Sequence, residues 1–329
     1  MRPGRAAVLL AALLLAACAA MTYPAGPAVT VPSVDSGHLV MADGARLPLR
    51  SWLPSGPPRA VVVALHGMND YSNFFDEPGI ALARHGIAGY AYDQRGFGAG
   101  PHPGHWSSAD AMTADAAAAI ALLADRHPGV PVFALGESMG GAVLMAMEAR
   151  GRTPAGLSGL ILSAPAVWGR ASMPWYQRAA LWLGHALVPG WRPSGRGLEI
   201  RPSDNVEMLR KLSADPLVIK ETRIDAIKGV VDLMDEAAVA APSVRTGALV
   251  LYGARDEVIP PQPTWAAIRA LPGLGRGQRV VLYDRGWHML LRDLQAQVVL
   301  DDIAAWVADR SAPLPSGGEM AAQARLHGG

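Results

Sequence analysis

Short runs of continuous apolar residues recur along the chain, and stretches with helical spacing separate them. Residues 59–67 (RAVVVALHG) are β-branched and apolar almost throughout and end in glycine, which is typical of a strand buried on both faces of a parallel sheet. Similar runs lie at 88–98, 131–135, 157–165, 248–256 and 278–284, and helical patterns lie at 74–85, 110–126, 140–150, 264–271 and 293–308. This alternation predicts βαβ units and an α/β fold with a mostly parallel sheet flanked by helices.

The alternation begins after a hairpin signal and is interrupted once. Residues 38–54 contain two short strand-like runs around Asp43-Gly44, which favours a hairpin. Residues 168–243 lack a buried strand pattern and instead carry four tryptophans, several prolines and helical stretches at 205–212 and 219–234. We therefore expect an α/β core made of residues 37–167 and 244–310, a helical cap at 168–243, and a flexible tail at 311–329 that is rich in Pro, Gly and Ala.

Composition and charge narrow the possible functions. The 329 residues are 50% hydrophobic and 17% charged with a net charge of +1, so the chain can bury a substantial core and has no basic run that indicates nucleic acid. A single cysteine excludes a disulfide within the chain, and no Cys/His cluster has zinc spacing. The glycine-rich RGFGAG is not followed by a helix in dinucleotide-binding context. We expect neither a metal nor an organic cofactor.

The N-terminus predicts export. Arg2 and Arg5 precede an apolar run at 6–16, which is shorter than the ~20 residues that a membrane-spanning helix needs. Residues 1–17 therefore have the pattern of a signal peptide. The following Leu-Ala-Ala-Cys18 resembles the lipobox of bacterial lipoproteins, which implies cleavage before Cys18 and lipid attachment to it; an ordinary signal peptide is the alternative.

The lipoprotein interpretation sets the expected location. Residues 18–36 contain three prolines among small residues and are expected to be a tether to the lipid. The expected location is then the bacterial cell envelope, with the anchor in the outer membrane or in the periplasmic face of the inner membrane. Multiple acyl chains would hold the protein stably on a membrane, where a single chain would be marginal.

One short motif carries candidate chemistry. Ser138 stands between Gly136 and Gly140 in a G-x-S-x-G pattern, which is weak evidence alone because the chain has 36 glycines. A strand pattern ends just before it and a helical pattern begins just after it. That strand–turn–helix context is the one that a nucleophile elbow requires, with glycines where the tight turn brings backbones together.

A serine nucleophile needs a base and an acid later in the chain, in the order Ser…Asp…His. Asp256 follows the strand pattern at 248–256, and His288 follows the last strand pattern, so both are expected at the carboxyl edge of the sheet. Asp256 would hold the imidazole in its working tautomer. Glu257 is the alternative acid.

Main-chain donors would complete such a site. The backbone N–H of Met139 follows the nucleophile, and that of Met68 lies in the loop after residues 59–67, so these two are the expected oxyanion-hole donors. His66 is expected to brace this loop rather than to do chemistry.

Five segments together carry a family resemblance: LHGMNDYSNFF, DQRGFGAG, GESMGG, YGARDEVIP and RGWHMLL. The chain resembles, over roughly residues 38–310, the monoacylglycerol lipase and lysophospholipase-like branch of the α/β-hydrolases, also grouped as serine-aminopeptidase-like hydrolases. The resemblance implies an inserted cap, Ser138 as nucleophile, Asp256 and His288 as its partners, and Met68 and Met139 as oxyanion donors. Many relatives carry His where this chain has Glu137, for which the sequence suggests no role.

The expected function is hydrolysis of acyl esters, such as monoacylglycerols, lysophospholipids or related carboxylic esters, through an acyl-enzyme. Three alternatives stay open: amide or peptide hydrolysis, acyl transfer to an alcohol, and a non-catalytic lipoprotein that uses the fold to bind. The sequence does not indicate the oligomeric state.

Three tryptophans of the expected cap are spaced by seven residues: Trp168, Trp175 and Trp182. On one continuous helix they would share a face, but Pro174 is a potential break. They could pack the cap on the core, line an acyl pocket as part of the substrate site, or touch a membrane surface.

Overall fold

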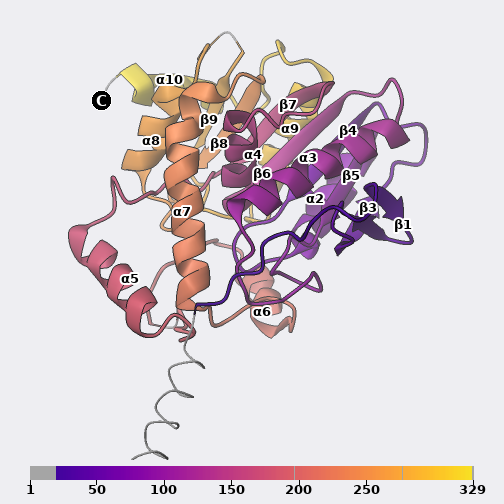
Figure 1. Ribbon diagram of the computed structural model, residues 1–329. Helices are drawn as coiled ribbons and strands as arrows, with labels where there is room; N and C mark the ends of the chain where they lie inside the picture. The colour runs from indigo at the N-terminus through magenta and orange to yellow at the C-terminus, as the bar shows by residue number, and fades with distance from the viewer. Residues whose placement is uncertain (1–19, 196, 276, 328–329) are drawn as a thin grey trace, which may run out of the picture.

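The computed structural model describes residues 20–195, 197–275 and 277–327, so Cys18 and the expected signal peptide lie outside the described residues. The described chain forms a nine-stranded sheet in the order β1-β2-β3-β5-β4-β6-β7-β8-β9 (Figure 1). The strands are β1 (Ser33–Asp35), β2 (His38–Val40), β3 (Arg46–Trp52), β4 (Ala60–Leu65), β5 (Ile87–Tyr92), β6 (Val132–Glu137), β7 (Leu157–Ser163), β8 (Ala248–Gly253) and β9 (Arg279–Tyr283). The pairs from β5 through β9 are parallel, and β1, β2 and β3 add an antiparallel edge.

Helices cover both faces of this sheet. The helices of the described residues are α2 (Asp76–Arg84), α3 (Ala109–Arg126), α4 (Met139–Ala149), α5 (Trp175–Leu187), α6 (Val206–Ala214), α7 (Ile224–Ala240), α8 (Pro261–Ala270), α9 (Ala296–Ala308) and α10 (Gly318–His327), with short 3-10 helices η1 (Ser72–Phe75) and η2 (Ala241–Ser243). The side chains of α2 and α9 pack on one face, and those of α3, α4, α7 and α8 pack on the other.

Strand β4 shows why the apolar runs are continuous. Val61, Val63 and Leu65 point into the core that contains α3 and α4, whereas Ala60, Val62 and Ala64 point into the core that contains α2 and α9. All six are fully or almost fully buried. A strand with helices on both faces has no solvent side, so the alternation of polar and apolar residues disappears. The predicted α/β fold with a mostly parallel sheet is confirmed.

The expected cap is smaller in structure than residues 168–243. Helices α5 and α6 have no buried residue, whereas α7 buries Ala226, Val231 and Leu233 among others and packs along α4 (Figure 1). The amphipathic pattern at 219–234 therefore belongs to a helix of the core layer. The sequence pattern did not separate α7 from the cap because both are helical and both follow the interruption of the strands.

Residues 20–30, which we term the N-terminal strap, lie against the folded core instead of forming the expected free tether. Their main-chain N–H groups donate to the core at four points: Met21 to Asp225 Oδ2 (3.0 Å), Tyr23 to Trp106 O (2.9 Å), Gly26 to Asp43 Oδ2 (3.0 Å) and Val29 to Ala42 O (2.7 Å). Further along, residues 33–35 form β1. Backbone hydrogen bonds to the core, which a composition-based argument cannot anticipate, hold this segment in place.

The C-terminal residues also differ from the expected flexible tail. Residues 318–327 form α10, which packs beside β9 and buries Ala322. Arg279 of β9 donates two hydrogen bonds to the carboxylate of Glu319, at 2.8 and 2.5 Å. The small residues that suggested disorder instead allow close packing, since a Cβ at Gly318 would lie 2.7 Å from Leu282 O.

Candidate active site

Ser138 occupies a sharp turn between β6 and α4. Its backbone has φ 52° and ψ −112°, a conformation that is strained for a residue with a side chain. Gly136 and Gly140 make the turn possible: an added Cβ would lie 2.4 Å from Gly140 C and 2.2 Å from Leu65 O, respectively. These contacts explain the glycine spacing of the motif, and they hold Ser138 half-buried at the carboxyl edge of the sheet.

His288 and Asp256 meet at the same edge, after β9 and β8. His288 Nδ1 and Asp256 Oδ2 are 2.8 Å apart, and both side chains are buried. The other carboxylate oxygen, Asp256 Oδ1, accepts hydrogen bonds from the backbone N–H groups of Val258 and Ile259 at 2.8 and 2.9 Å. Burial lowers the pKa of His288, but the Asp256 carboxylate outweighs it and holds that pKa above the ordinary value. The contact with Asp256 Oδ2 thus fixes the orientation of the imidazole through Nδ1.

The immediate surroundings of Ser138 come from the loop after β4 and from the start of α4. No hydrogen bond joins Ser138 to His288 among the described residues, a looseness that free hydrolases often show. The loop after β4 lies against the serine, since a Cβ at Gly67 would be 3.3 Å from Ser138 Cβ. Met68 follows Gly67, and Met139 is the first residue of α4, where the N–H lacks an intrahelical acceptor. Both expected oxyanion donors therefore lie in segments that adjoin Ser138.

Glu137, for which the sequence suggested no role, has a defined partner. Its Oε1 accepts a hydrogen bond from Arg292 Nη2 at 2.8 Å, and the same nitrogen lies 2.8 Å from Asp70 Oδ2. All three side chains are buried. Burial raises the pKa of Glu137, and the Arg292 guanidinium opposes that rise. For Arg292, burial acts against the charge, but the two carboxylates outweigh it and raise the pKa.

His66 braces the loop after β4, as expected. Its Nε2 accepts the backbone N–H of Gln94 at 3.0 Å, so the proton is on Nδ1, which donates to Gly67 O at 2.8 Å. The Gln94 amide in turn donates to His66 O. Burial lowers the pKa of His66 and keeps the ring neutral.

The segment before α6 is fastened to the loops that carry the acid and the histidine. Arg201 N donates to Glu257 Oε2 at 2.7 Å, so the alternative acid holds the cap and is exposed. Ser203 Oγ donates to Asp293 Oδ1 at 2.5 Å, and Trp287 N donates to Asp293 Oδ2 at 2.7 Å. Burial raises the pKa of Asp293 to about 6.

The three tryptophans do not form one stripe. Pro174 is the N-cap of α5, so the helix begins at Trp175 and Trp168 lies before it, packed against the core. Trp175 and Trp182 are 75% and 72% exposed. The structure therefore breaks the pattern at Pro174, and the rings of Trp175 and Trp182 are exposed to solvent.

Sequence reasoning missed Arg292, Asp70 and Asp293. A carboxylate in a buried strand needs a cation, so Glu137 itself signalled that a partner exists. Nothing in the sequence distinguished Arg292 from the other 28 basic residues. Asp293 lies two residues beyond the segment RGWHMLL, and its position in the sequence indicated no role.

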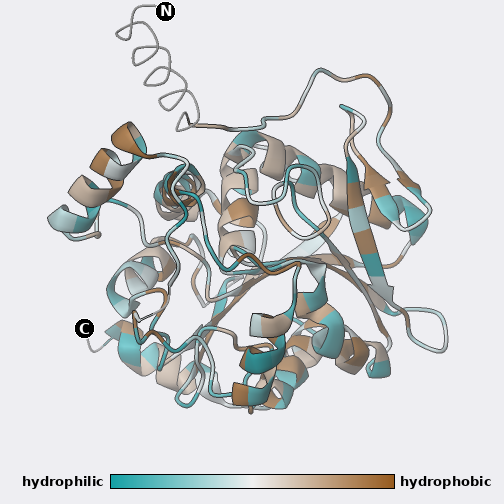
Figure 2. Ribbon diagram, turned by 90° about the horizontal axis from the view of Figure 1, so that it is seen from below, coloured by the Kyte–Doolittle hydropathy of each residue, from teal (hydrophilic) through white to brown (hydrophobic). Residues whose placement is uncertain are grey.

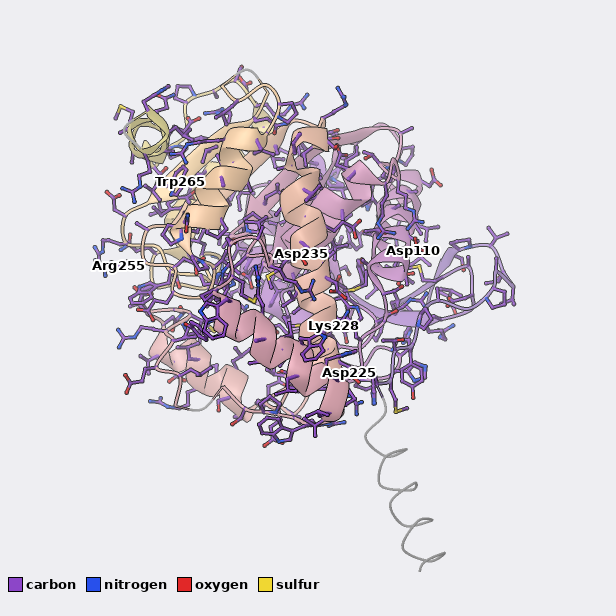
Figure 3. All side chains as sticks on the ribbon, turned by 60° about the vertical axis from the view of Figure 1, so that its left-hand side comes forward. Asp110, Asp225, Lys228, Asp235, Arg255 and Trp265 are labelled. Carbon is purple, nitrogen blue, oxygen red and sulfur yellow. The ribbon has the colours of Figure 1, made fainter. Side chains whose placement is uncertain are left out.

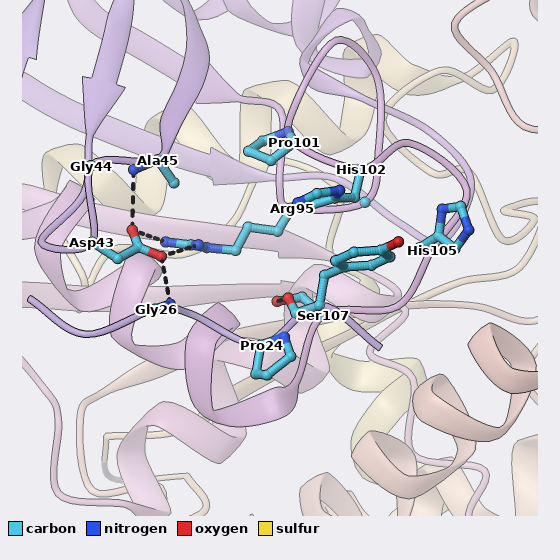
Figure 4. Close-up of a pocket in the computed structure, with 12 residues that line it drawn as sticks. Pro24, Gly26, Asp43, Gly44, Ala45, Arg95, Pro101, His102, His105 and Ser107 are labelled. Atoms are coloured by element: carbon cyan, nitrogen blue, oxygen red, sulfur yellow. Dashed lines mark hydrogen bonds and ion pairs between the residues drawn. The ribbon is translucent and has the colours of Figure 1, made fainter. Parts of the chain in front are cut away.

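The described cavities lie away from Ser138. One of about 400 Å³ lies between the N-terminal strap and the core, where Tyr23 stacks on His102 and Arg95 donates to Asp43 (Figure 4). Another of about 1020 Å³ lies beside α10. In the described part of the chain, no group of three or more His, Cys, Asp or Glu side chains could hold a metal ion.

These observations first define the class: the order of the strands, the turn at Ser138 and the acid and histidine after β8 and β9 are those of the α/β-hydrolase fold. The family model described as "Serine aminopeptidase, S33" matches residues 56–295, and the chain belongs to this family. The monoacylglycerol lipase of Mycolicibacterium smegmatis is 28% identical over 286 residues, which are 84% of this chain and 98% of that protein. The human monoglyceride lipase is 24% identical over 295 residues, covering 86% and 93%.

Solved structures agree on the fold. The monoacylglycerol lipase of Paleococcus ferrophilus superimposes with a TM-score of 0.67 at 23% identity, over 80% of this chain and 99% of that chain. A soluble variant of monoglyceride lipase from Saccharomyces cerevisiae, in complex with a substrate analog, has a TM-score of 0.70 at 20% identity, over 89% and 100%. The chain is thus similar to monoglyceride lipases and esterases, at low identity.

Proposed function

We propose that the protein hydrolyses carboxylic esters of the monoacylglycerol or lysophospholipid type. Ser138 Oγ attacks the ester carbonyl while His288 Nε2 accepts its proton, and the N–H groups of Met68 and Met139 receive the developing oxyanion. His288 then protonates the leaving alcohol, and water releases the acyl group by the same route. The observation that carries the proposal is the buried His288–Asp256 pair beside the strained turn of Ser138.

The similarity to monoglyceride lipases supports an ester substrate, whereas the family's description names an aminopeptidase. Amide hydrolysis is therefore the second candidate. A panel of 4-nitrophenyl esters, monoacylglycerols and aminoacyl anilides distinguishes the two. We expect turnover of the esters, and faster turnover of anilides would favour amide hydrolysis.

Labelling with a fluorophosphonate tests the nucleophile directly. The wild-type protein should label, and Ser138→Ala should not. Ser36→Ala is the matched control, because Ser36 also has a positive φ but lies on an exposed hairpin far along the chain from the motif. Wild-type protein that does not label, or Ser138→Ala that labels equally, would leave the non-catalytic binding role as the better hypothesis.

The proposal also includes attachment to a membrane through Cys18. The backbone N–H of Met21 donates a hydrogen bond to Asp225 Oδ2. Asp225 lies in the first turn of α7, near the point where the described chain begins (Figure 3). Two residues separate Met21 from Cys18, so three chain steps limit the distance between their Cα atoms to about 11 Å. Asp225 N donates to Pro189 O just after α5, so this point adjoins the exposed apolar surface of that helix.

That surface suits a lipid bilayer. Most exposed residues of α5 and of the segment after it are aromatic or aliphatic, and Arg178 is the exposed charged residue of the helix; the large ones are Trp175, Tyr176, Trp182, Leu183, Leu187 and Trp191. The helix also shows brown, hydrophobic segments at the upper left of Figure 2. Indole and phenol rings favour the membrane interface. No helix in the described ranges is long and apolar enough to span a bilayer. The partner proposed for this surface is the bilayer into which the lipid on Cys18 would insert.

Vesicle binding separates the anchor from the surface. Protein expressed with its leader in a bacterium should incorporate labelled palmitate, and Cys18→Ser should not. Unlipidated protein from residue 20 onward should still bind vesicles of phosphatidylglycerol and phosphatidylethanolamine weakly, and Trp175→Ala/Trp182→Ala should lower that binding at least about 10-fold. Binding that is unchanged in the double variant would remove α5 from the contact.

A further inference from the structure

One guanidinium joins three of the four loops that build the candidate site. Arg292 Nη2 lies 2.8 Å from Glu137 Oε1 and 2.8 Å from Asp70 Oδ2. Glu137 directly precedes Ser138, Asp70 follows Met68 by two residues, and Arg292 follows His288 by four. A single side chain therefore joins the nucleophile loop, the oxyanion loop and the histidine loop.

We propose that Arg292, Glu137 and Asp70 form a clamp that positions Ser138, the Met68 N–H and His288 relative to one another. Its activity readout rests on the proposed function, whereas its spectroscopic readout does not. The clamp members are positioning residues, since none of them is the nucleophile, the base or the acid. We refer to these three residues as the Arg292 clamp.

The burial of the three side chains means that the clamp forms only when all three loops are in place. The side chains of Arg292, Asp70 and Glu137 are 7%, 7% and 3% exposed, so water cannot replace a missing partner. A buried charge without a counter-charge is costly, which means that the three loops must come together for all three charges to be tolerated. The guanidinium also lies over the Phe74 ring, 5.8 Å from its centroid, which closes one side of the cluster. Movement of any one loop would expose or unpair a charge.

The clamp also shapes the electrostatic field at His288. The charged groups that face His288 are Asp256, Glu137 and Arg292. Those that face Glu137 are Arg292, Asp70 and His288, and Glu137 in turn acts on Asp293. Glu137 favours the protonated imidazole, and Arg292 disfavours it. Removing one or the other charge must therefore move the titration of His288 in opposite directions.

The first test is the pH profile of kcat/KM on a short 4-nitrophenyl ester. We expect Glu137→Gln to move the acid-side midpoint to lower pH and Arg292→Met to move it to higher pH, each by about 0.5–1 pH unit. We expect kcat to fall up to about 10²-fold in both variants, with a much smaller change in KM, because misplaced catalytic groups slow the chemical step. Midpoints that stay at the wild-type value, or that move in the same direction, would overturn the proposal.

A second buried cluster supplies the matched control. Arg95 is bound by Asp43 and Asp115, and the three side chains are 7%, 10% and 7% exposed. This cluster repeats the chemistry of the Arg292 clamp but contacts none of the three catalytic loops. Asp115→Asn should therefore lower the melting temperature without moving the midpoint or the kcat. An equal shift of the midpoint in this variant would mean that the Arg292 clamp acts only through general stability.

A conservative substitution of Arg292 tests whether its charge alone is enough. Arg292→Lys keeps the charge, but its ammonium ends one bond short of the position of Nη2, which reaches both carboxylates, so the midpoint should stay near wild type while kcat remains lowered. This variant also serves if Arg292→Met does not fold. Recovery of full kcat by lysine would show that charge alone matters and would refute the positioning role.

The downfield proton resonance of His288 Nδ1, assigned by its loss in His288→Gln, reports the same titration without substrate. If the wild-type protein neither hydrolyses esters nor labels with fluorophosphonate, the proposed function fails. Opposite shifts of this resonance in Glu137→Gln and Arg292→Met would still support the clamp, and unchanged titration would refute it.

Discussion

The substitution Asp256→Asn tests the role of the acid with little change in shape. Asp256 Oδ1 accepts two backbone N–H groups, those of Val258 and Ile259, and Oδ2 faces His288 Nδ1. In asparagine the carbonyl oxygen must stay on the two N–H donors, because an NH₂ group there would face two donors. The NH₂ group then points at His288 Nδ1.

That orientation fixes the wrong tautomer of the imidazole. Nδ1 must become the acceptor, so the proton moves to Nε2, which can no longer take the proton of Ser138 Oγ. In a Ser-His-Asp enzyme this error costs about 10⁴-fold in kcat, equivalent to about 5.5 kcal/mol of transition-state stabilisation. The two backbone hydrogen bonds survive, so the free energy of unfolding should change by no more than about 1–2 kcal/mol.

Initial rates on 4-nitrophenyl butyrate, together with thermal unfolding, measure both effects. Glu257→Gln is the matched control, since Glu257 is adjacent in sequence but accepts its hydrogen bond from Arg201 of the cap. We expect Glu257→Gln to keep most of the wild-type kcat. A loss below about 10-fold in Asp256→Asn, or a larger loss in Glu257→Gln, would refute the assignment of the acid and the argument from the fixed amide.

Three further outcomes follow from the geometry. Gly140→Ala places a Cβ 2.2 Å from a main-chain oxygen of β4, so it should destabilise the fold by at least about 3 kcal/mol. Gly195→Ala is the control, because open space surrounds Gly195, and it should change the melting temperature little. Equal melting temperatures of the two variants would refute the close-packing argument. Deletion of residues 318–329 should lower the melting temperature because it removes α10 from β9. An unchanged melting temperature would favour the expectation that this segment is a flexible tail. The pH profile of kcat/KM should rise with pH through a midpoint above 6.5, since neutral His288 is the active form and, despite burial, Asp256 raises its pKa; a midpoint at or below 6.5 would contradict this sign.

The predicted elements held where the local pattern was strong. Strand β4 was expected at 59–67 and lies at Ala60–Leu65, and the helix expected at 110–126 lies at Ala109–Arg126. The alternation of such elements is enough to define a parallel sheet, because buried strands and amphipathic helices have different periods. The cap boundary was harder, since α7 has the same helical period whether it packs on the core or covers it.

Some features of the candidate site could likewise be predicted from the sequence, and others could not. The turn at Ser138 could be predicted because only glycine at 136 and 140 fits so close an approach of strand and helix. Asp256 and His288 followed from their positions after strands. The pairing of Glu137 with Arg292 could not be predicted, because 155 residues separate them and any basic residue could have been the partner.

By itself, the sequence determined the α/β architecture, the turn that presents Ser138 and the order of the residues after β8 and β9, because each depends on local spacing and backbone sterics. Only the tertiary structure decided that Arg292 joins three loops, that residues 20–30 lie on the core, that residues 318–327 form a packed helix and that Trp175 and Trp182 face solvent. These features depend on which distant groups meet when the chain is compact, and burial then makes their charges and hydrogen bonds obligatory.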